Sequence, residues 1–210
     1  SLKGVKCQIK YFNTKSGLRN RWPLKIAGRF NQLNAEAAWQ AAQFIGVKKY
    51  DAMKAVEGYH GSWRRMEEMS TPKLITDGEK LRGTFFSDYA HHPNEIKATI
   101  SALKEKYPKR KLLIIFQPHQ LERINNLFDD FLASFGEADQ VALMPAYEVP
   151  GRESSGFKKN SEDLYKELKN IRDAKGQDTF YLKNFTEVFK LIHGQVVVFM
   201  GAGNMDSEVR

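Results

Sequence analysis

The sequence is poor in cysteine and has no long hydrophobic run. Its 210 residues include one cysteine, Cys7, which excludes an internal disulfide and fits a reducing cytosol. No apolar segment approaches the roughly 20 residues that a membrane-spanning helix needs. Lys3, Lys6 and Lys10 interrupt the first residues, so a secretory signal peptide is not expected there. We therefore expect a cytoplasmic protein without a membrane partner.

Concentrated positive charge is also missing, although the chain carries a net charge of +8. The basic residues are scattered, and runs such as Lys104-Glu105-Lys106 mix both signs, as solvated helix faces do. The densest basic cluster, Lys109-Arg110-Lys111, precedes a predicted strand. A nucleic-acid partner is therefore not expected. The positive excess suits an enzyme whose substrates carry phosphates and carboxylates.

Strands and helices alternate over the later part of the chain. Predicted strands lie at Leu74–Asp77, Gly83–Asp88, Lys111–Phe116, Gln140–Met144, Thr179–Leu182 and Val196–Met200. Predicted helices lie at Pro93–Lys106, Leu121–Phe135, Ser161–Ala174 and Phe185–Ile192. This alternation predicts an α/β fold, Rossmann-like, with a mostly parallel sheet and helices on both faces.

The first seventy residues differ in pattern. Alternating apolar residues predict an antiparallel hairpin of Val5–Tyr11 and Trp22–Ile26. Apolar residues at helical spacing then predict helices at Asn31–Ile45, ended by Gly46, and at Tyr50–Glu57. Ser70-Thr71-Pro72 marks the expected boundary. We expect residues 1–70 to form a small α+β unit and residues 71–210 to form the α/β domain.

Four predicted strands stop at polar clusters. These clusters are Asp88-Tyr89-Ala90-His91-His92-Pro93, Gln117-Pro118-His119, Pro145-Ala146-Tyr147 and Gly201-Ala202-Gly203-Asn204. The carboxyl ends of parallel strands meet at one edge of a sheet, where ligands bind. Three of the five histidines, His91, His92 and His119, fall at two of these ends. The sequence therefore predicts a binding site at this edge.

The side chains at these ends suit polar ligands. Asp88 could accept hydrogen bonds from ribose hydroxyls, or it could cap a turn. His91 and His92 are adjacent and point different ways, so they are not expected to bind one metal, and both could be surface residues. His119 and Arg123 are four residues apart, as on one helix face, and could hold a carboxylate. Arg123 could also be a solvated helix residue.

Two further motifs lie in the earlier part of the chain. The amides of Asn31 and Asn34 offer a donor and an acceptor side by side, which suits adenine, although both residues could instead cap a helix. The guanidinium groups of Arg64 and Arg65 match phosphate oxygens. Without further information, these arginines would be interpreted as a basic loop between domains. The Gly201–Asn204 segment looks like a glycine-rich phosphate loop, but no helix clearly follows it, so it is interpreted as structural.

These motifs, in this order, resemble those of the Mur ligase family over essentially the whole chain. Asp88–Pro93 and Phe116–His119 match its C-terminal-domain strings, and Gly61–Glu67 resembles Gly-x-x-Arg-Arg-x-Glu. Gly28–Ala35 resembles Gly-x-His-Asn-x-x-Asn-Ala, but Phe30 replaces the usual His. Gln120 likewise stands where alanine-adding members carry an Arg, which leaves the amino-acid specificity open. The Phe-Gln-Pro-His string favours the alanine-adding branch over the tripeptide-recycling one.

The resemblance implies an ATP-dependent carboxylate–amine ligase of peptidoglycan synthesis that works through an acyl phosphate. ATP and Mg²⁺ would be its cofactors. UDP-N-acetylmuramate and L-alanine, or a related amino acid or peptide, would be its substrates. Residues 1–70 would be the end of the central ATP-binding domain and residues 71–210 the C-terminal domain. The sequence has no P-loop, so we expect a fragment that is inactive alone and lacks most Mg²⁺ ligands.

The resemblance also assigns roles to single residues. Asn31, Asn34 and Asp88 would contact ATP, and Arg64 or Arg65 would neutralise the γ-phosphate. Tyr89, His91, His119 and Arg123 would line the amino-acid site, whereas His92 could be structural. Two other functions remain open: a murein tripeptide-recycling ligase, and a non-catalytic α/β binding module that uses the same sheet edge.

Overall fold

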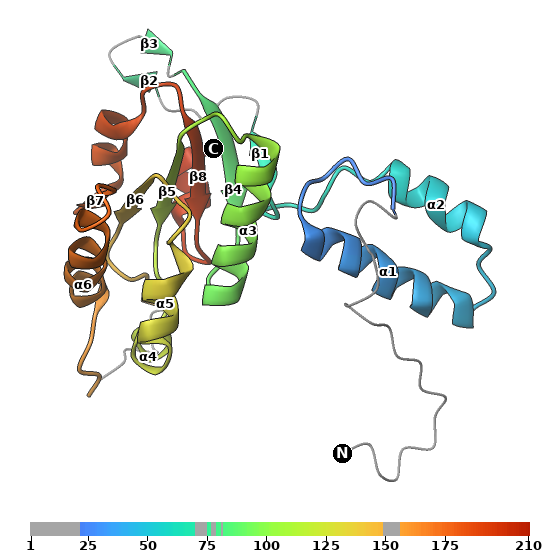
Figure 1. Cartoon of the computed structure of the whole chain (residues 1–210), viewed down its shortest axis with the longest axis horizontal. Helices are drawn as coiled ribbons and strands as arrows, with labels where there is room; N and C mark the ends of the chain where they lie inside the picture. Colours follow the sequence, from blue (N-terminus) through green and yellow to red (C-terminus); the bar gives the residue numbers. More distant parts are fainter. Residues whose placement is uncertain (1–21, 70–74, 77–78, 81, 149–155) are drawn as a thin grey trace. The chain divides into compact units, whose positions relative to one another are not determined.

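The computed structural model of the protein describes residues 22–69, 75–76, 79–80, 82–148 and 156–210. The chain divides into two compact units, Ser1–His60 and Gly61–Arg210 (Figure 1). The predicted strand at Val5–Tyr11 and the predicted boundary at Ser70–Pro72 lie outside the described residues.

The smaller unit contains α1 (Arg29–Phe44) and α2 (Lys49–Glu57). Both predicted helices are therefore confirmed, and Gly46 follows α1 with a φ of 82°, as a terminating glycine does. The strand predicted at Trp22–Ile26 is wrong, because this segment contains bends and no strand. Trp22 instead packs its ring against Trp39, with centroids 6.2 Å apart, and is buried. Burial of an aromatic side chain, and not sheet pairing, explains the apolar pattern there.

The larger unit is built on a six-stranded sheet. Its strands are β1 (Glu67–Met69), β4 (Thr84–Asp88), β5 (Leu112–Phe116), β6 (Gln140–Leu143), β7 (Asp178–Tyr181) and β8 (Val196–Met200), in the order β1-β4-β8-β5-β6-β7. All neighbours are parallel except β1, which pairs antiparallel with β4. The predicted α/β fold with a mostly parallel sheet is confirmed.

A separate two-stranded sheet contains β2 (Ile75–Thr76) and β3 (Glu79–Lys80). The described part of the strand predicted at Leu74–Asp77 is therefore not in the main sheet, which corrects the prediction. The main sheet has β1 at one of its two edges, next to β4, and the sequence did not predict this strand. β1 has only three residues, Glu-Glu-Met, and carries no hydrophobic run of its own.

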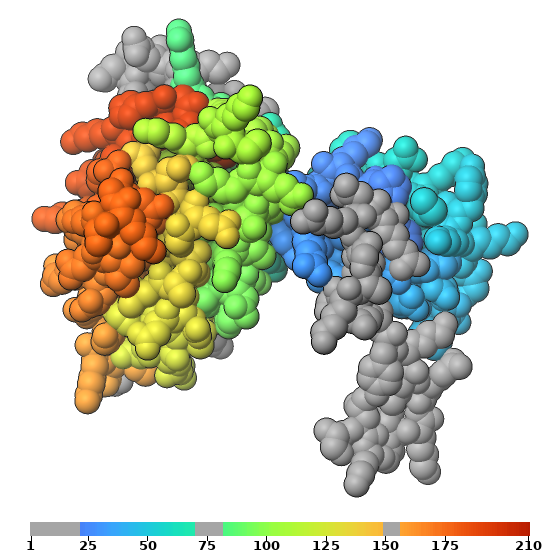
Figure 2. Space-filling view, in the orientation of Figure 1, coloured from blue at the N-terminus to red at the C-terminus, as the bar shows by residue number. Residues whose placement is uncertain are grey.

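Helices cover both faces of the main sheet. They are α3 (Pro93–Lys106), α4 (Leu121–Asn126), α5 (Phe128–Ser134), α6 (Ser161–Asp173), the 3₁₀ helix η1 (Phe185–Leu191) and α7 (Met205–Val209). On one face Phe116 of β5 contacts Phe131 and Phe135, with centroids 5.8 and 5.4 Å away. On the other face Phe199 of β8 contacts Phe185 at 5.9 Å. Figures 1 and 2 show α3, α4, α5 and α6 over the face nearest the viewer.

Two predicted helices differ from the structure in detail. The helix expected at Leu121–Phe135 is broken at Leu127, which has a φ of −126° and ends α4 where α5 begins. The helix expected at Phe185–Ile192 is a 3₁₀ helix. α7 was not predicted. Within the described part of the chain, none of the helices is both long and apolar enough to cross a membrane.

The strands end level with one another, which matters for the site. Asp88 pairs with Met200, and Met200 pairs with Phe116 on its other side. Phe116 pairs with Leu143, and Leu143 pairs with Tyr181. The residues that follow each of these strands therefore start from one edge of the sheet, as predicted.

Candidate functional site

Asp88, the last residue of β4, turns its carboxylate inward. The side chain is 3% exposed. Oδ2 accepts hydrogen bonds from the Met66 N–H at 2.9 Å and the Thr99 hydroxyl at 3.2 Å, and Oδ1 accepts one from the Ala90 N–H at 2.7 Å. Burial raises the pKa of Asp88 in spite of these bonds. Asp88 thus stabilises the turn after β4, which agrees with the alternative that it caps a turn. Its contact with ATP stays a prediction.

Arg64 connects two loops of the larger unit through its buried side chain. Its side chain is buried and donates from Nη2 to the carbonyl oxygens of Gly201 and Gly203. Its Nε lies 3.8 Å from Oδ1 of Asp206. These contacts join the turn before β1 to the loop after β8. The φ of Arg64 is 53°, in the left-handed region that a non-glycine residue enters only when its surroundings hold it there.

Arg65 is exposed, in contrast to its neighbour. The residues on both sides of it have a left-handed backbone conformation, with a φ of 53° at Arg64 and 48° at Met66. The Arg65 guanidinium lies 3.4 Å, Nη1 to Oε1, from Glu95. Of the two arginines that the sequence singled out, Arg65 is the one that can reach a phosphate.

Tyr89 connects the arginines with the histidines. Its ring centroid lies 4.9 Å from Cζ of Arg64 and 5.6 Å from Cζ of Arg65. The same ring meets the His91 ring edge-on, with centroids 5.2 Å apart. Cations over aromatic faces are attracted by the ring quadrupole. Tyr89 therefore forms part of one packed row from Arg65 to His91.

His91 and His92 open α3 and have different roles. His92 is the N-cap, and its Nδ1 accepts a hydrogen bond from the Asn94 N–H at 3.3 Å. This geometry fits the structural role considered for His92. The Nδ1 of His91 lies 2.9 Å from the carbonyl oxygen of Tyr89 and can donate to it. In the neutral ring, that bond leaves Nε2 as the acceptor.

Glu95 completes this cap. Its Oε2 accepts hydrogen bonds from the N–H groups of His91 at 3.1 Å and His92 at 3.2 Å. Burial alone would raise the pKa of Glu95, but the backbone hydrogen bonds from His91 and His92, with the charges of His91 and Arg65, lower it. The carboxylate is therefore ionised at neutral pH.

His119 lies across from His91 at the end of β5. The two ring centroids are 6.4 Å apart. The His119 ring also stacks on Tyr147, with centroids 5.8 Å apart and planes 16° from parallel. Backbone bonds from the Tyr147 N–H to Pro118 and from the Gln120 N–H to Tyr147 hold the two loops together. Gln120 itself has a φ of 67°, so the loop turns sharply just after His119.

Arg123 acts electrostatically on His119, although not from the position that the sequence suggested. α4 begins at Leu121, so His119 lies outside the helix and the shared helix face is wrong. Burial lowers the pKa of His119, and the charges of Arg123 and His91 lower it further. The Arg123 Nη1 is buried and has no hydrogen-bond partner among the described residues. A neutral imidazole beside an unpaired guanidinium N–H suits a carboxylate ligand.

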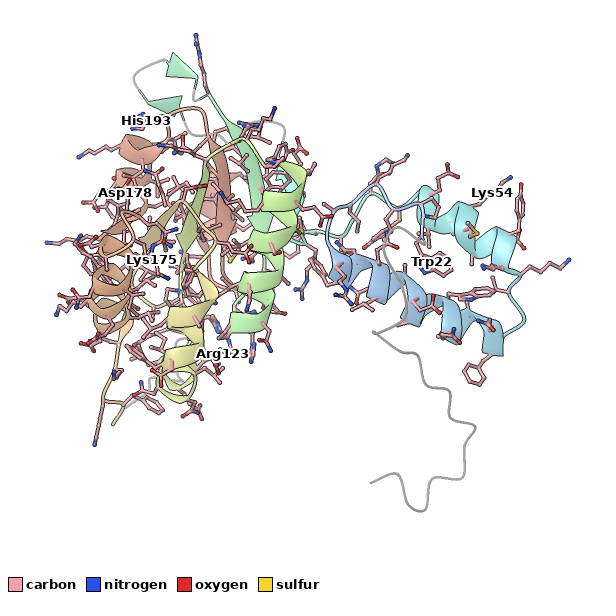
Figure 3. All side chains as sticks on the ribbon, viewed as in Figure 1. Trp22, Lys54, Arg123, Lys175, Asp178 and His193 are labelled. Carbon is pink, nitrogen blue, oxygen red and sulfur yellow. The ribbon has the colours of Figure 1, made fainter. Side chains whose placement is uncertain are left out.

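The loop after β8 packs too closely for side chains. A Cβ on Gly201, whose φ is 150°, would lie 2.5 Å from the carbonyl oxygen of Gln117, and one on Gly203 would meet Oε1 of Gln117 and Tyr147. This close packing agrees with the structural role expected for the segment. Figure 3 shows Arg123 toward the end of the sheet where the strands stop, and His193 and Asp178 toward the end where they start.

Asn31 and Asn34 lie in the smaller unit. Both are inside α1, whose N-cap is Gly28, so the capping alternative for them is wrong. The Asn31 Nδ2 donates to the carbonyl oxygen of Ala27 at 2.6 Å, and Asn34 is exposed. Their contact with adenine stays a prediction.

Glu95 was not predicted as a residue of the site, and Tyr147 was placed at the sheet edge by its cluster but was given no role. Glu95 follows His92 by three residues, which is the spacing of a capping box and was the available signal. Tyr147 follows the Val141–Met144 run at the same sheet edge. Within the described ranges no group of three or more His, Cys, Asp or Glu side chains could hold a metal ion.

The chain matches known proteins over most of its length. The family described as "Mur ligase, glutamate ligase domain" matches residues 64–203. The UDP-N-acetylmuramate–L-alanine ligase of Bdellovibrio bacteriovorus is 35% identical over 89% of this chain and 39% of that protein. The corresponding ligase of Lactiplantibacillus plantarum is 32% identical over 97% of this chain and 42% of that protein.

A solved structure has the same fold. The UDP-N-acetylmuramate–alanine ligase of Thermotoga maritima aligns with a TM-score of 0.63 and 23% identity, over 88% of this chain and 37% of that one. The chain thus spans about two fifths of the length of the relatives it matches. With the match over residues 64–203, the chain belongs to the Mur ligase family.

Proposed function

We propose that this chain contributes the amino-acid site and part of the ATP site of an ATP-dependent ligase that joins L-alanine to UDP-N-acetylmuramate. The observation that carries the proposal is the approach of the His91 and His119 rings to 6.4 Å at the sheet edge. The charge of Arg123 acts on His119, and the Arg123 Nη1 has no hydrogen-bond partner among the described residues. The printed activity of relatives that are 35% and 32% identical supports the choice of substrates.

The two sides of the site would take different ligands. Arg123 and His119 would bind the carboxylate of the amino acid, with the guanidinium donating to it. His91 would lie beside the amine. Arg65, exposed and fixed on its turn, would donate to phosphate oxygens. Arg64 would act only through the turn that presents Arg65.

In the proposed reaction the carboxylate of UDP-N-acetylmuramate takes the γ-phosphoryl group of ATP and becomes an acyl phosphate. The amine of L-alanine then attacks the acyl carbon and phosphate leaves, which gives an amide, ADP and phosphate. The contribution of this chain is to orient the amine and to stabilise phosphate charge. Exclusion of water would protect the acyl phosphate from hydrolysis.

We also propose that the 210-residue chain is inactive alone. It spans 39% of the Bdellovibrio ligase, and its sequence has no P-loop to hold a triphosphate. The described residues, moreover, contain no cluster for Mg²⁺. The remaining ligands would come from elsewhere in a longer protein.

A hybrid enzyme tests this function. The chain replaces the segment that it matches in the Bdellovibrio ligase, and ADP release is measured with UDP-N-acetylmuramate and either L-alanine or murein tripeptide. We expect release that depends on L-alanine, and none from the chain alone. Release only with tripeptide would indicate the recycling ligase. A folded hybrid that binds UDP-N-acetylmuramate but releases no ADP would favour a binding module.

Arg65→Ala in the hybrid separates catalysis from folding. Because Arg65 is exposed, its loss should change the free energy of unfolding by no more than about 0.5 kcal/mol. The rate of ADP release should fall by about 100-fold or more, since a donor to developing charge is lost. An unchanged rate would remove Arg65 from the phosphate site.

A further inference from the structure

Glu95 makes more contacts than a helix cap needs. As residue N3 of α3 it accepts the backbone N–H groups of His91 and His92 through Oε2. The same oxygen lies 3.7 Å from Nδ1 of the His91 ring, and Oε1 lies 3.4 Å from Nη1 of Arg65. One carboxylate therefore touches residues on both sides of the site.

The cap itself does not require a charge. Glutamine serves at N3 of a capping box, because its side-chain oxygen accepts the same backbone hydrogen bonds. The contacts with the guanidinium of Arg65 and the ring of His91 are different, because a negative charge strengthens both. The charge of Glu95 is thus available for organising these two side chains.

The backbone around Arg65 is already fixed by other bonds. The Met66 N–H donates to Asp88, the Arg64 N–H donates to Glu67, and the Tyr89 N–H donates to the Arg64 carbonyl oxygen. The exposed Arg65 side chain contacts Glu95 and the Tyr89 ring, and its charge also acts on the buried Asp88 carboxylate. Without the carboxylate, this long side chain would gain rotamer freedom.

We infer that Glu95 is a positioning residue that holds the Arg65 guanidinium and the His91 imidazole in one arrangement at the sheet edge. Glu95 touches neither substrate in this account. It acts through Arg65 on the phosphate side and through His91 on the amino-acid side, so it links the two. The inference rests on the proposed function for its kinetic consequence, but its structural part stands on the contacts alone.

The test compares the chain carrying Glu95→Gln with the wild type and with Glu105→Gln. Glu105 is an exposed acid near the other end of α3, which makes it a matched control for charge. Side-chain NMR of Arg65 and of the His91 ring reports their order. We expect Glu95→Gln to keep the thermal midpoint close to that of the wild type while the signals of both side chains shift and narrow. Glu105→Gln should leave them unchanged.

The same variants in the hybrid ligase give the functional readout. Glu95→Gln should raise the KM for ATP and the KM for L-alanine together, each on the order of 10-fold to 100-fold, because both contact residues lose their place. A purely structural cap predicts wild-type KM values and unchanged Arg65 and His91 signals, and this result would overturn the inference. A large fall in thermal midpoint would overturn it too. If the wild-type hybrid makes no product, the proposed function fails, and the NMR comparison alone decides the inference.

Discussion

Arg64 and Arg65 are neighbours in the sequence but have different surroundings at the scale of single residues. Arg64 is buried against the carbonyl groups of the loop after β8, whereas Arg65 is exposed beside Glu95. A motif of two arginines does not reveal this division, because burial depends on which strand the turn packs against. The sequence could indicate a pair of arginines suited to phosphate, and only the fold shows that Arg64 is buried and Arg65 is exposed.

Gly201 gives a prediction at this scale. Gly201→Ala should destabilise the chain by about 2–4 kcal/mol, because the new Cβ would lie 2.5 Å from the Gln117 carbonyl oxygen at a φ of 150°. Urea unfolding measures the effect. Gly136→Ala is the control, since the nearest atom to its Cβ would be 3.9 Å away. Equal stabilities for the two variants would contradict the close packing of this loop.

His119 gives a second prediction. Burial and the charges of Arg123 and His91 lower its folded-state pKa below the ordinary 6.5. As the pH falls through 6.5, the unfolded chain takes up a proton at His119 and the folded chain resists it, so the free energy of unfolding falls. His119→Gln removes this contribution. Urea unfolding should therefore show that, between about pH 7 and pH 5, the free energy of unfolding falls less in the variant than in the wild type. A larger fall in the free energy of unfolding for His119→Gln than for the wild type would contradict a lowered pKa of His119.

At the scale of elements, α7 fastens the edge of the sheet near the site. Oδ1 of Asp206 accepts a hydrogen bond from Ser87 of β4 at 2.6 Å, and Oδ2 accepts one from Arg210 at 2.8 Å. Arg210 also donates to Glu67 of β1 at 2.6 Å. A helix of five residues thus connects β4 and β1 with the turn that carries Arg65.

Asp206→Asn should weaken this connection. Burial opposes ionisation, but the hydrogen bonds from Ser87 and Arg210 and the nearby positive charges lower the pKa of Asp206 below the ordinary 3.8. Its stabilisation is therefore present at neutral pH and is lost as the pH falls through the lowered pKa. We expect the free energy of unfolding of Asp206→Asn to be lower than that of the wild type by about 1–3 kcal/mol near pH 7. This difference should become smaller below about pH 4. The exposed Asp130→Asn is the control, and equal unfolding curves for both variants would exclude the fastening role.

The sequence predicted those elements whose signals are local. β4, β5, β6 and β8 are hydrophobic runs, and α3 was predicted with its bounds because Pro93 suits the first position of a helix. β1 could not be predicted, since its three residues form a strand only by pairing with β4. The break at Leu127 interrupts an apolar stripe that continues across it, so periodicity did not show it.

In the candidate site, too, residues with a local sequence signal could be predicted, and contacts that depend on tertiary packing could not. His91, His119 and Arg123 could be found because they follow hydrophobic strands, and the register of those strands brings their ends together. The inward turn of Asp88 could not be found, because it depends on Met66 and Thr99 from distant positions. The stacking of Tyr147 on His119 was not predicted, because it depends on how the loop after β6 packs against the loop after β5.

At the scale of the whole molecule, the larger unit is built on a mostly parallel sheet whose last strand in the chain, β8, lies between β4 and β5. This order places the loop after β8 between the loop that carries His91 and the loop that carries His119. Three segments distant in the chain therefore border one edge. The family match over residues 64–203 covers most of this unit.

The central claim is that this edge binds the amino acid through Arg123. The most direct measurement is the KM for L-alanine of the hybrid ligase with Arg123→Met, with ATP and UDP-N-acetylmuramate saturating. The account predicts a rise of about 30-fold or more, equivalent to losing a charge-assisted hydrogen bond of about 2 kcal/mol, with little change in the KM for ATP. A KM for L-alanine equal to that of the unmodified hybrid would contradict it.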